Sequence, residues 1–190
     1  DIPKMLTGIS QHSDRIKNIV GDLRDLSKRK RVDLAEELSI SHVLRSAVSV
    51  LQNRIIEFTD HFTFSSTDDD QALVVGHAQQ LEQAFMNVIL NALQALPDRT
   101  MGVYVSMGYS HDRKEILVEV RDDGVGIPSE NLDRITETFY STKTDEGGTG
   151  LGLAITSSII QQHNGRLEFQ SEPGKGTTVT MTLPMFVSEK

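Results

Sequence analysis

Apolar side chains recur every seven residues along the first part of the chain, from about residue 4 to residue 28. The two columns of this repeat are Ile9, Ile16 and Leu23, and His12, Ile19 and Leu26. A two-column seam of this kind is typical of a helix in a coiled coil or a helical bundle. Each apolar side chain left in water would forgo about 1.5–3 kcal/mol, so we expect a partner helix. That partner is either a second copy, as in a homodimer of the longer protein, or sequence outside this chain.

Downstream of this helix, stretches with helical periodicity and stretches with strand character alternate. Ser41 is a candidate N-terminal cap for the first of these helices, and Pro97 ends the second. Helices are predicted at residues 41–51, 79–96 and 150–163, and strands at 55–64, 72–75, 103–109, 116–120, 166–170 and 177–183. The long segment 123–148 shows little periodicity and is expected to be a loop.

This order of elements predicts an α+β fold built as a two-layer α/β sandwich. Each predicted helix has a single apolar stripe, which fits a mixed sheet with helices on one face. The long N-terminal helix precedes that sandwich. We therefore expect two units, a helical segment at residues 1–31 and the main domain at residues 32–190.

Composition excludes several classes of function. The formal net charge of -8 argues against a nucleic-acid surface, which needs a basic patch. The absence of cysteine excludes disulfides, thiolate catalysis and cysteine-ligated zinc. No apolar run approaches the roughly 20 residues that span a bilayer, and no signal peptide is visible. We expect a cytoplasmic protein without membrane contact of its own, or the cytoplasmic part of an anchored one. Since the chain begins at Asp1, we also expect it to be a fragment.

Two asparagines within the apolar helix at 79–96 are the first candidate site residues. Asn87 and Asn91 are four residues apart and so project from one face of the helix. Asparagine is unfavourable in the middle of a helix, which argues that these amides have a use beyond solvation or capping. Amide oxygens are hard ligands of the kind that Mg²⁺ accepts while it keeps waters and phosphate oxygens.

The segment Asp122-Asp-Gly-Val-Gly-Ile-Pro follows a predicted strand and has the spacing D-x-G-x-G. A carboxylate at this place can accept a hydrogen bond from the exocyclic amine of adenine, and it would reject the oxygen of guanine. Gly124 and Gly126 would let the backbone approach the base closely. The alternative is an ordinary Asp-Gly turn, and Asp123 is the competing carboxylate.

The glycines at 148, 150 and 152 stand directly before a predicted helix. Such a turn directs backbone N–H groups and the positive end of the helix toward a phosphate. The pattern G-x-x-x-x-G-K-[ST] is missing, so a P-loop is excluded. The polar residues before the glycines favour a lid that closes over a nucleotide. Lys143 and Lys175 are candidate phosphate contacts, although an exposed lysine is more often only solvated.

Taken together, five ordered segments resemble the ATP-binding domain of bacterial sensor histidine kinases. They correspond to its N, G1, F, G2 and G3 boxes and lie at residues 87–91, 122–128, 139–143, 148–153 and 174–177. The resemblance covers roughly residues 32–184 and implies a Bergerat-type fold. The N-terminal helix, at residues 16–23 above all, is similar to the second helix of the dimerisation and phosphotransfer hairpin in that family.

The resemblance implies that this chain binds ATP with Mg²⁺. Asn87 would bind the magnesium, Asn91 would contact the phosphates, and Asp122 would hold the adenine amine with Thr177 beside it through a water. Residues 149–152 would wrap the phosphates. The implied ATP-binding residues are Asn87, Asn91, Asp122, Gly124, Gly126, Ile127, Lys143, Thr149, Gly150, Leu151, Gly152 and Thr177.

The resemblance also implies a protein-histidine kinase whose phosphoacceptor lies outside this chain. The acceptor histidine of the family is followed by an acidic residue, whereas His12 is followed by Ser13. No catalytic residue is therefore assigned, and the fragment alone is not expected to phosphorylate itself. From the acceptor, the phosphate would pass to an aspartate on a response regulator.

Two alternatives stay open. Gyrase, the heat-shock chaperone ATPases and the mismatch-repair ATPases share the pocket, but they carry a glutamate where this chain has Asn87. Without that general base, transfer is favoured over hydrolysis. The other alternative is not an enzyme: a nucleotide-gated dimerisation or signalling module with little turnover.

Overall fold

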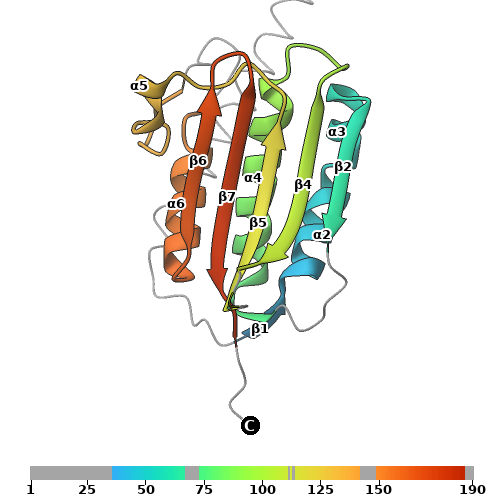
Figure 1. Cartoon of the computed structure of the whole chain (residues 1–190). Helices are drawn as coiled ribbons and strands as arrows, with labels where there is room; N and C mark the ends of the chain where they lie inside the picture. The colour runs from blue at the N-terminus through green and yellow to red at the C-terminus, as the bar shows by residue number, and fades with distance from the viewer. Residues whose placement is uncertain (1–35, 67–72, 111, 113, 142–148, 187–190) are drawn as a thin grey trace, which may run out of the picture.

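A five-stranded sheet forms one layer of the molecule, and helices form the other (Figure 1). The computed structural model describes residues 36–66, 73–110, 112, 114–141 and 149–186. The strand order across the sheet is β2-β4-β5-β7-β6. These strands are β2 (His61–Ser66), β4 (Gly102–Tyr109), β5 (Glu115–Asp122), β6 (Arg166–Glu172) and β7 (Gly176–Pro184).

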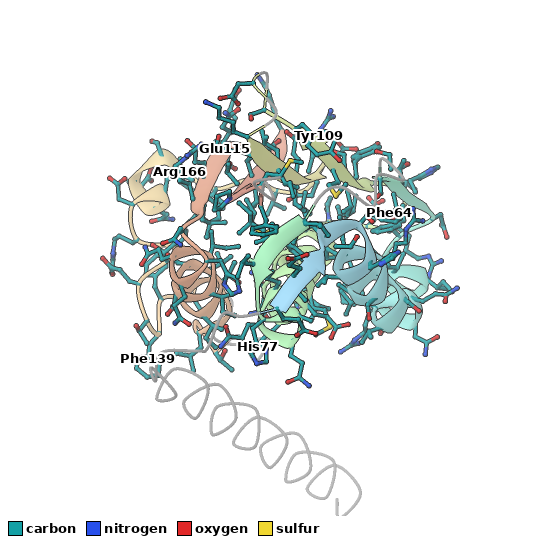
Figure 2. The ribbon with its side chains drawn as sticks, turned by 90° about the horizontal axis from the view of Figure 1, so that it is seen from below. Phe64, His77, Tyr109, Glu115, Phe139 and Arg166 are labelled. Atoms are coloured by element: carbon teal, nitrogen blue, oxygen red, sulfur yellow. The ribbon has the colours of Figure 1, made fainter. Side chains whose placement is uncertain are left out.

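The helices cover only one face of this sheet, as the view along the layers shows (Figure 2). The helical layer consists of α2 (Ile40–Val50), α3 (Gln52–Phe58), α4 (Ala78–Ala95) and α6 (Gly152–Gln162). A single short turn of helix, α5 (Ser129–Leu132), lies at the β6 edge. Two further strands, β1 (Glu36–Ser39) and β3 (Leu73–Gly76), form a small antiparallel sheet of their own.

The sheet is mixed because one strand pair runs parallel and the others run antiparallel. β2 and β4 are parallel, and the chain between them passes through β3 and α4. β4–β5, β5–β7 and β6–β7 are antiparallel. A parallel pair needs a crossover of this kind, whereas the antiparallel pairs can be closed by short turns. The predicted α+β sandwich with helices on one face is confirmed.

The core lies between the two layers and follows from the period-two pattern of the strands. In β5, Ile116, Val118 and Val120 are fully buried, while the alternate residues Glu119 and Arg121 are exposed. The helices contribute their apolar stripes to the same core. In α4 the largest fully buried side chains of this stripe are Leu81, Phe85, Ile89 and Leu93. Burying each such side chain stabilises the fold by about 1.5–3 kcal/mol.

Some predicted elements differ from those observed. The strand predicted at 55–64 is a helix, α3, up to Phe58, and only from His61 does the chain enter β2. The pair of isoleucines at 55 and 56 favours a strand by propensity. In the fold, Ile55 is buried in the core while Ile56 is exposed, so packing on one helical face overrides that preference.

The start of the helix predicted at residues 41–51 also needs correction. α2 begins at Ile40 with Ser39 as its N-cap, so Ser41 is a buried residue of the first turn. Its hydroxyl is hydrogen-bonded to that of Ser39 at 3.0 Å. The segment before the helix is also not a plain connection, because residues 36–39 form β1.

The heptad seam and His12 lie outside the described residues, so the N-terminal helix and the boundary at residue 31 stay predictions. Among the helices that the structure describes, none is long and apolar enough to cross a membrane.

A buried histidine joins the end of α6 to the start of α4. His163 is 1% exposed, and its Nδ1–H donates to the Ile159 carbonyl oxygen at 2.7 Å. The Nε2 atom accepts from the backbone N–H of His77, the N-cap of α4, at 3.0 Å. His77 lies beside α4 on the side away from the sheet (Figure 2). Both ring nitrogens are used by a neutral imidazole, so a second proton would break the bond to His77.

We expect this histidine to make the protein less stable in mild acid. Burial lowers the pKa of His163 below the ordinary value of 6.5, with a smaller contribution from His77, so the unfolded chain takes up a proton more readily than the folded one. The free energy of unfolding therefore falls as the pH drops below about 6.5. Urea unfolding at pH 7.5 and pH 5.5 measures this loss.

The matched variant is His163→Gln, whose amide oxygen can still accept from His77 but cannot be protonated. We expect it to cost about 1 kcal/mol at pH 7.5 and to show a smaller loss between the two pH values. Equal losses of unfolding free energy in the variant and the wild type would contradict the assignment of the pH dependence to His163.

Candidate functional site

Several of the predicted site residues that the structure describes stand where elements end or begin at one end of the sandwich, the upper end in Figure 1. At this end β5 finishes at Asp122, β7 begins at Gly176, and α6 begins at Gly152. The loop after β5 runs back over the end of α4, where the Val125 N–H donates to the Ala95 carbonyl at 3.0 Å. The C-terminal end of α4 therefore lies beside the Asp-Gly motif.

Asp122 is a buried carboxylate at the end of β5. It is 4% exposed, and its Oδ1 accepts from the Gly124 N–H at 2.8 Å and from the Thr177 N–H at 3.2 Å. An ionised group is costly to bury unless such donors replace its water. The two amides come from the loop that follows β5 and from the neighbouring strand β7, so both flanking backbones have to lie close to this side chain.

Asp123 faces a different environment from its neighbour. Its Oδ2 accepts from the Tyr104 hydroxyl at 3.0 Å, and its Oδ1 accepts from the Arg121 guanidinium at 3.1 Å. Both partners are exposed residues of the open face of the sheet. The hydrogen bond to Asp123 raises the pKa of Tyr104. The structure thus directs the two adjacent carboxylates to opposite sides, with Asp122 on the side of the helices.

The close approach of the backbones explains two of the glycines in these motifs. Gly126 has φ +68°, and a Cβ there would collide with the Glu172 carbonyl oxygen of β6. Gly176 has φ +89°, and a Cβ there would collide with the Asp122 carbonyl oxygen. Both conformations also favour glycine by themselves. The loop is tied further by the Gly174 N–H, which donates to the Val125 carbonyl at 2.8 Å.

Ser171 joins three segments at this end, and sequence reasoning missed it. It lies opposite Thr177 in the β6–β7 ladder. Its Oγ accepts from the Ile127 N–H at 2.7 Å, donates to the Gly176 carbonyl at 2.9 Å and is 2.9 Å from the Thr177 hydroxyl. In the sequence, Ser171 is only one of the polar residues between Phe169 and the turn, and nothing else there indicates this role.

Asn87 and Asn91 lie one turn apart on α4, and both are half-buried. The Asn87 Nδ2 donates to the Gly152 carbonyl at 3.2 Å and lies 3.5 Å from the Thr156 hydroxyl. Because both neighbours are acceptors, the nitrogen arm of the amide faces α6 and the oxygen arm points away from it. An amide oxygen on the side away from α6 is a hard ligand, so Asn87 fits a magnesium site as its one protein ligand.

Thr156 is a second residue that the sequence reasoning missed. It is fully buried in α6, and its hydroxyl donates to the Gly152 carbonyl at 2.9 Å. The Gly152 carbonyl therefore accepts from both Thr156 and Asn87. A threonine inside an apolar helix does not by itself indicate this role. No group of three or more acidic or histidine side chains that could hold a metal occurs within the described residues.

The end of the glycine loop packs onto the segment before it. The Phe139 N–H donates to the Gly150 carbonyl at 2.9 Å, and a Cβ on Gly150 would meet the Phe139 backbone at 2.5 Å. The Thr149 hydroxyl accepts from the Leu151 N–H at 3.3 Å. The Leu151 side chain is fully buried in the core, so only its backbone can face a ligand. Phe139, by contrast, is exposed on the helix side (Figure 2).

The two candidate lysines have different outcomes. Lys143 lies outside the described residues, as does Gly148 at the start of the glycine loop. Lys175 is paired with Glu172 across the β6–β7 turn at 2.8 Å, and both side chains are exposed. Such a surface pair contributes about 0–1 kcal/mol and leaves Lys175 on the turn, so it gives no support for a phosphate contact there.

Comparison with known proteins agrees with this geometry. The family described as histidine kinase-, DNA gyrase B-, and HSP90-like ATPase matches residues 76–186. Sporulation kinase A of Bacillus subtilis is 34% identical over 170 residues, which are 90% of this chain and 27% of that protein. This chain thus spans about a quarter of the length of that relative.

Solved structures show the same fold. Full-length ShkA, solved with AMPPNP, superposes with a TM-score of 0.80 at 21% identity and covers 99% of this chain and 40% of that one. The histidine kinase ThkA, solved in complex with the response regulator protein TrrA, gives a TM-score of 0.75 at 20% identity and covers 100% of this chain and 53% of that one. The resemblance to sensor histidine kinases that the motifs predicted is confirmed.

The two glycines of the β6–β7 turn allow a matched test of the close approach at Asp122. Both have positive φ, but only Gly176 has backbone where a Cβ would go, because nothing lies within 4 Å at Gly174. Gly174→Ala should cost about 1–2 kcal/mol of stability from its conformation alone. Gly176→Ala should cost about 1–3 kcal/mol more, as overpacking does. Equal costs in urea unfolding would show that β5 and β7 are not held so closely.

Proposed function

Because the chain belongs to the histidine kinase-, DNA gyrase B- and HSP90-like ATPase family, we propose that it is the ATP-binding catalytic part of a two-component sensor histidine kinase. In this proposal it donates the γ-phosphoryl group of ATP to a histidine outside the chain. The observation that carries it is the geometry at one end of the sandwich. A buried acceptor carboxylate stands at one end of α4, and an amide that is bonded to the glycine loop stands midway along the same helix.

Asp122 would recognise the adenine base. A carboxylate can only accept hydrogen bonds, and the exocyclic amine of adenine can only donate them. Gly124 and Thr177 hold one carboxylate oxygen in place, so the group is oriented before the nucleotide binds. Gly126 keeps the adjoining loop backbone close to β6, and the Ile127 N–H is already bonded to Ser171.

The phosphates would lie between α4 and the first turn of α6. The backbone N–H groups at residues 149–152 and the positive end of α6 supply donors for them. Asn87 would hold a magnesium ion through its amide oxygen, and Asn91, one turn further, would contact the phosphates. When bound, the ion would neutralise charge that develops on the phosphate oxygens. Lys143 would add a cation from the segment before the glycines.

The chemistry assigned to this chain is positioning and electrostatic stabilisation. Transfer of a phosphoryl group needs an aligned nucleophile more than a covalent step on the enzyme. Asn87 stands where a hydrolytic relative would carry a glutamate, and an amide cannot remove a proton from water. In this proposal the imidazole nitrogen of the acceptor histidine attacks the γ-phosphorus, and the bond from that phosphorus to the bridging oxygen breaks so that ADP leaves.

Partners follow from the same proposal. ThkA was solved in complex with the response regulator protein TrrA, and this chain covers 53% of ThkA. We propose that a response-regulator aspartate receives the phosphate here too. The heptad seam of the N-terminal segment would pair two copies in the longer protein. We expect the domain to act in the cytoplasm, since ATP is made and used there.

Asp122→Asn should weaken ATP binding by about 1–3 kcal/mol, roughly 5- to 150-fold in Kd. The amide keeps the size of the carboxylate but brings an NH₂ group against either the backbone donors or the adenine amine. Asp123→Asn is the matched control, because that side chain faces Tyr104 and Arg121 on the open side. Calorimetry with ATP measures both. Unchanged affinity in Asp122→Asn would remove the adenine assignment.

Phosphate transfer tests the kinase activity itself. The chain is mixed with Mg-ATP labelled at the γ-phosphate and with a helical hairpin that carries the acceptor histidine of the same kinase. We expect acid-labile label on the hairpin. Asn87→Ala should lose both this label and the magnesium-dependent affinity for ATP. Gln79→Ala, which changes an exposed residue of the same helix, should retain them. ATP binding without any transfer would instead favour a nucleotide-gated module.

A further inference from the structure

The direction of the hydrogen bonds around Ser171 determines what Thr177 can offer a ligand. Three groups surround the Ser171 hydroxyl within 2.9 Å: the Ile127 N–H, the Gly176 carbonyl and the Thr177 hydroxyl. The Ile127 N–H can only donate, so Ser171 accepts that bond. The Gly176 carbonyl can only accept, so it takes the single proton of Ser171.

The bond between the two hydroxyls then has only one possible direction. Ser171 has no proton left, so the Thr177 O–H must donate to Ser171. With its proton used in this way, Thr177 can present only lone pairs to a ligand. Thr177 is 7% exposed and pairs with Asp122 across β5 and β7, so its hydroxyl is buried beside that residue.

We propose that Ser171 is a positioning residue that makes Thr177 an obligate acceptor and so sets the selectivity of the site for an adenine over a 6-oxopurine base. The inference rests on the proposed function, because it assigns the base to Asp122 and Thr177. Two acceptors, one carboxylate and one hydroxyl, match the two protons of an exocyclic amine that contacts both of them directly. A carbonyl oxygen at the same ring position would meet lone pairs from both.

Ser171→Ala tests this directly. The variant removes the acceptor of the Thr177 proton, and Thr177 can then turn that proton toward the ligand. ATP and inosine triphosphate are the probes, since inosine carries an oxygen in place of the exocyclic amine and a proton on the adjacent ring nitrogen. We expect the ratio of the two Kd values to fall about fivefold to tenfold, the worth of one hydrogen bond. If Ser171 had only a structural role, the variant would bind both nucleotides more weakly and the ratio of the Kd values would stay unchanged. That result would overturn the proposal.

Two further variants show that the effect acts through Thr177. Ser171→Thr keeps a hydroxyl and should retain the wild-type ratio. In a Thr177→Val background, Ser171→Ala should change the ratio no further, because no hydroxyl is left to reorient. If Ser171→Ala does not fold, Ser171→Cys replaces the hydroxyl by a weak acceptor of similar size and gives the same comparison. A further change of several-fold in the Thr177→Val background would refute the mechanism.

Asp122→Asn separates this inference from the proposed function. If that variant loses ATP affinity while Ser171→Ala keeps the wild-type ratio, only the role of Ser171 fails. If Asp122→Asn binds ATP as tightly as the wild type, the adenine assignment itself fails.

Discussion

The burial of one carboxylate constrains most of this end of the molecule. Asp122 cannot keep its charge in the interior without donors, and the donors available are backbone N–H groups of its own loop and of β7. For those groups to reach it, the backbones have to approach more closely than a Cβ would allow. The glycine at 176 meets this need beside Asp122, and the one at 126 does so beside β6.

One helix, α4, links the buried carboxylate to the glycine loop before α6. α4 contacts the Asp-Gly loop near its C-terminus through Ala95, and it contacts the start of α6 through Asn87. Its buried face packs against the sheet along the whole distance between these points. A well-packed helix therefore fixes the separation between the Asp-Gly loop and the start of α6.

Local sequence patterns singled out residues of the candidate site, but they placed some of the elements wrongly. Asn87, Asn91 and Asp122 could be singled out because spacing along a helix or after a strand is local information. Residues 55–58 were predicted wrongly because two isoleucines favour a strand locally, whereas burial of Ile55 and exposure of Ile56 fit one face of a helix. Ser171 and Thr156 were missed because each depends on partners far away in the chain.

By itself, the sequence determined the fold class, the motif set and the family, since all three depend on patterns of neighbouring residues. Only the tertiary structure decided which of two adjacent aspartates is buried, which way the Asn87 amide turns, and in which direction the Ser171 and Thr177 hydroxyls donate. These outcomes depend on which donors and acceptors meet across strands and helices. Hydrogen bonds are directional and act over about 3 Å, so the folded arrangement has to be known before they can be assigned.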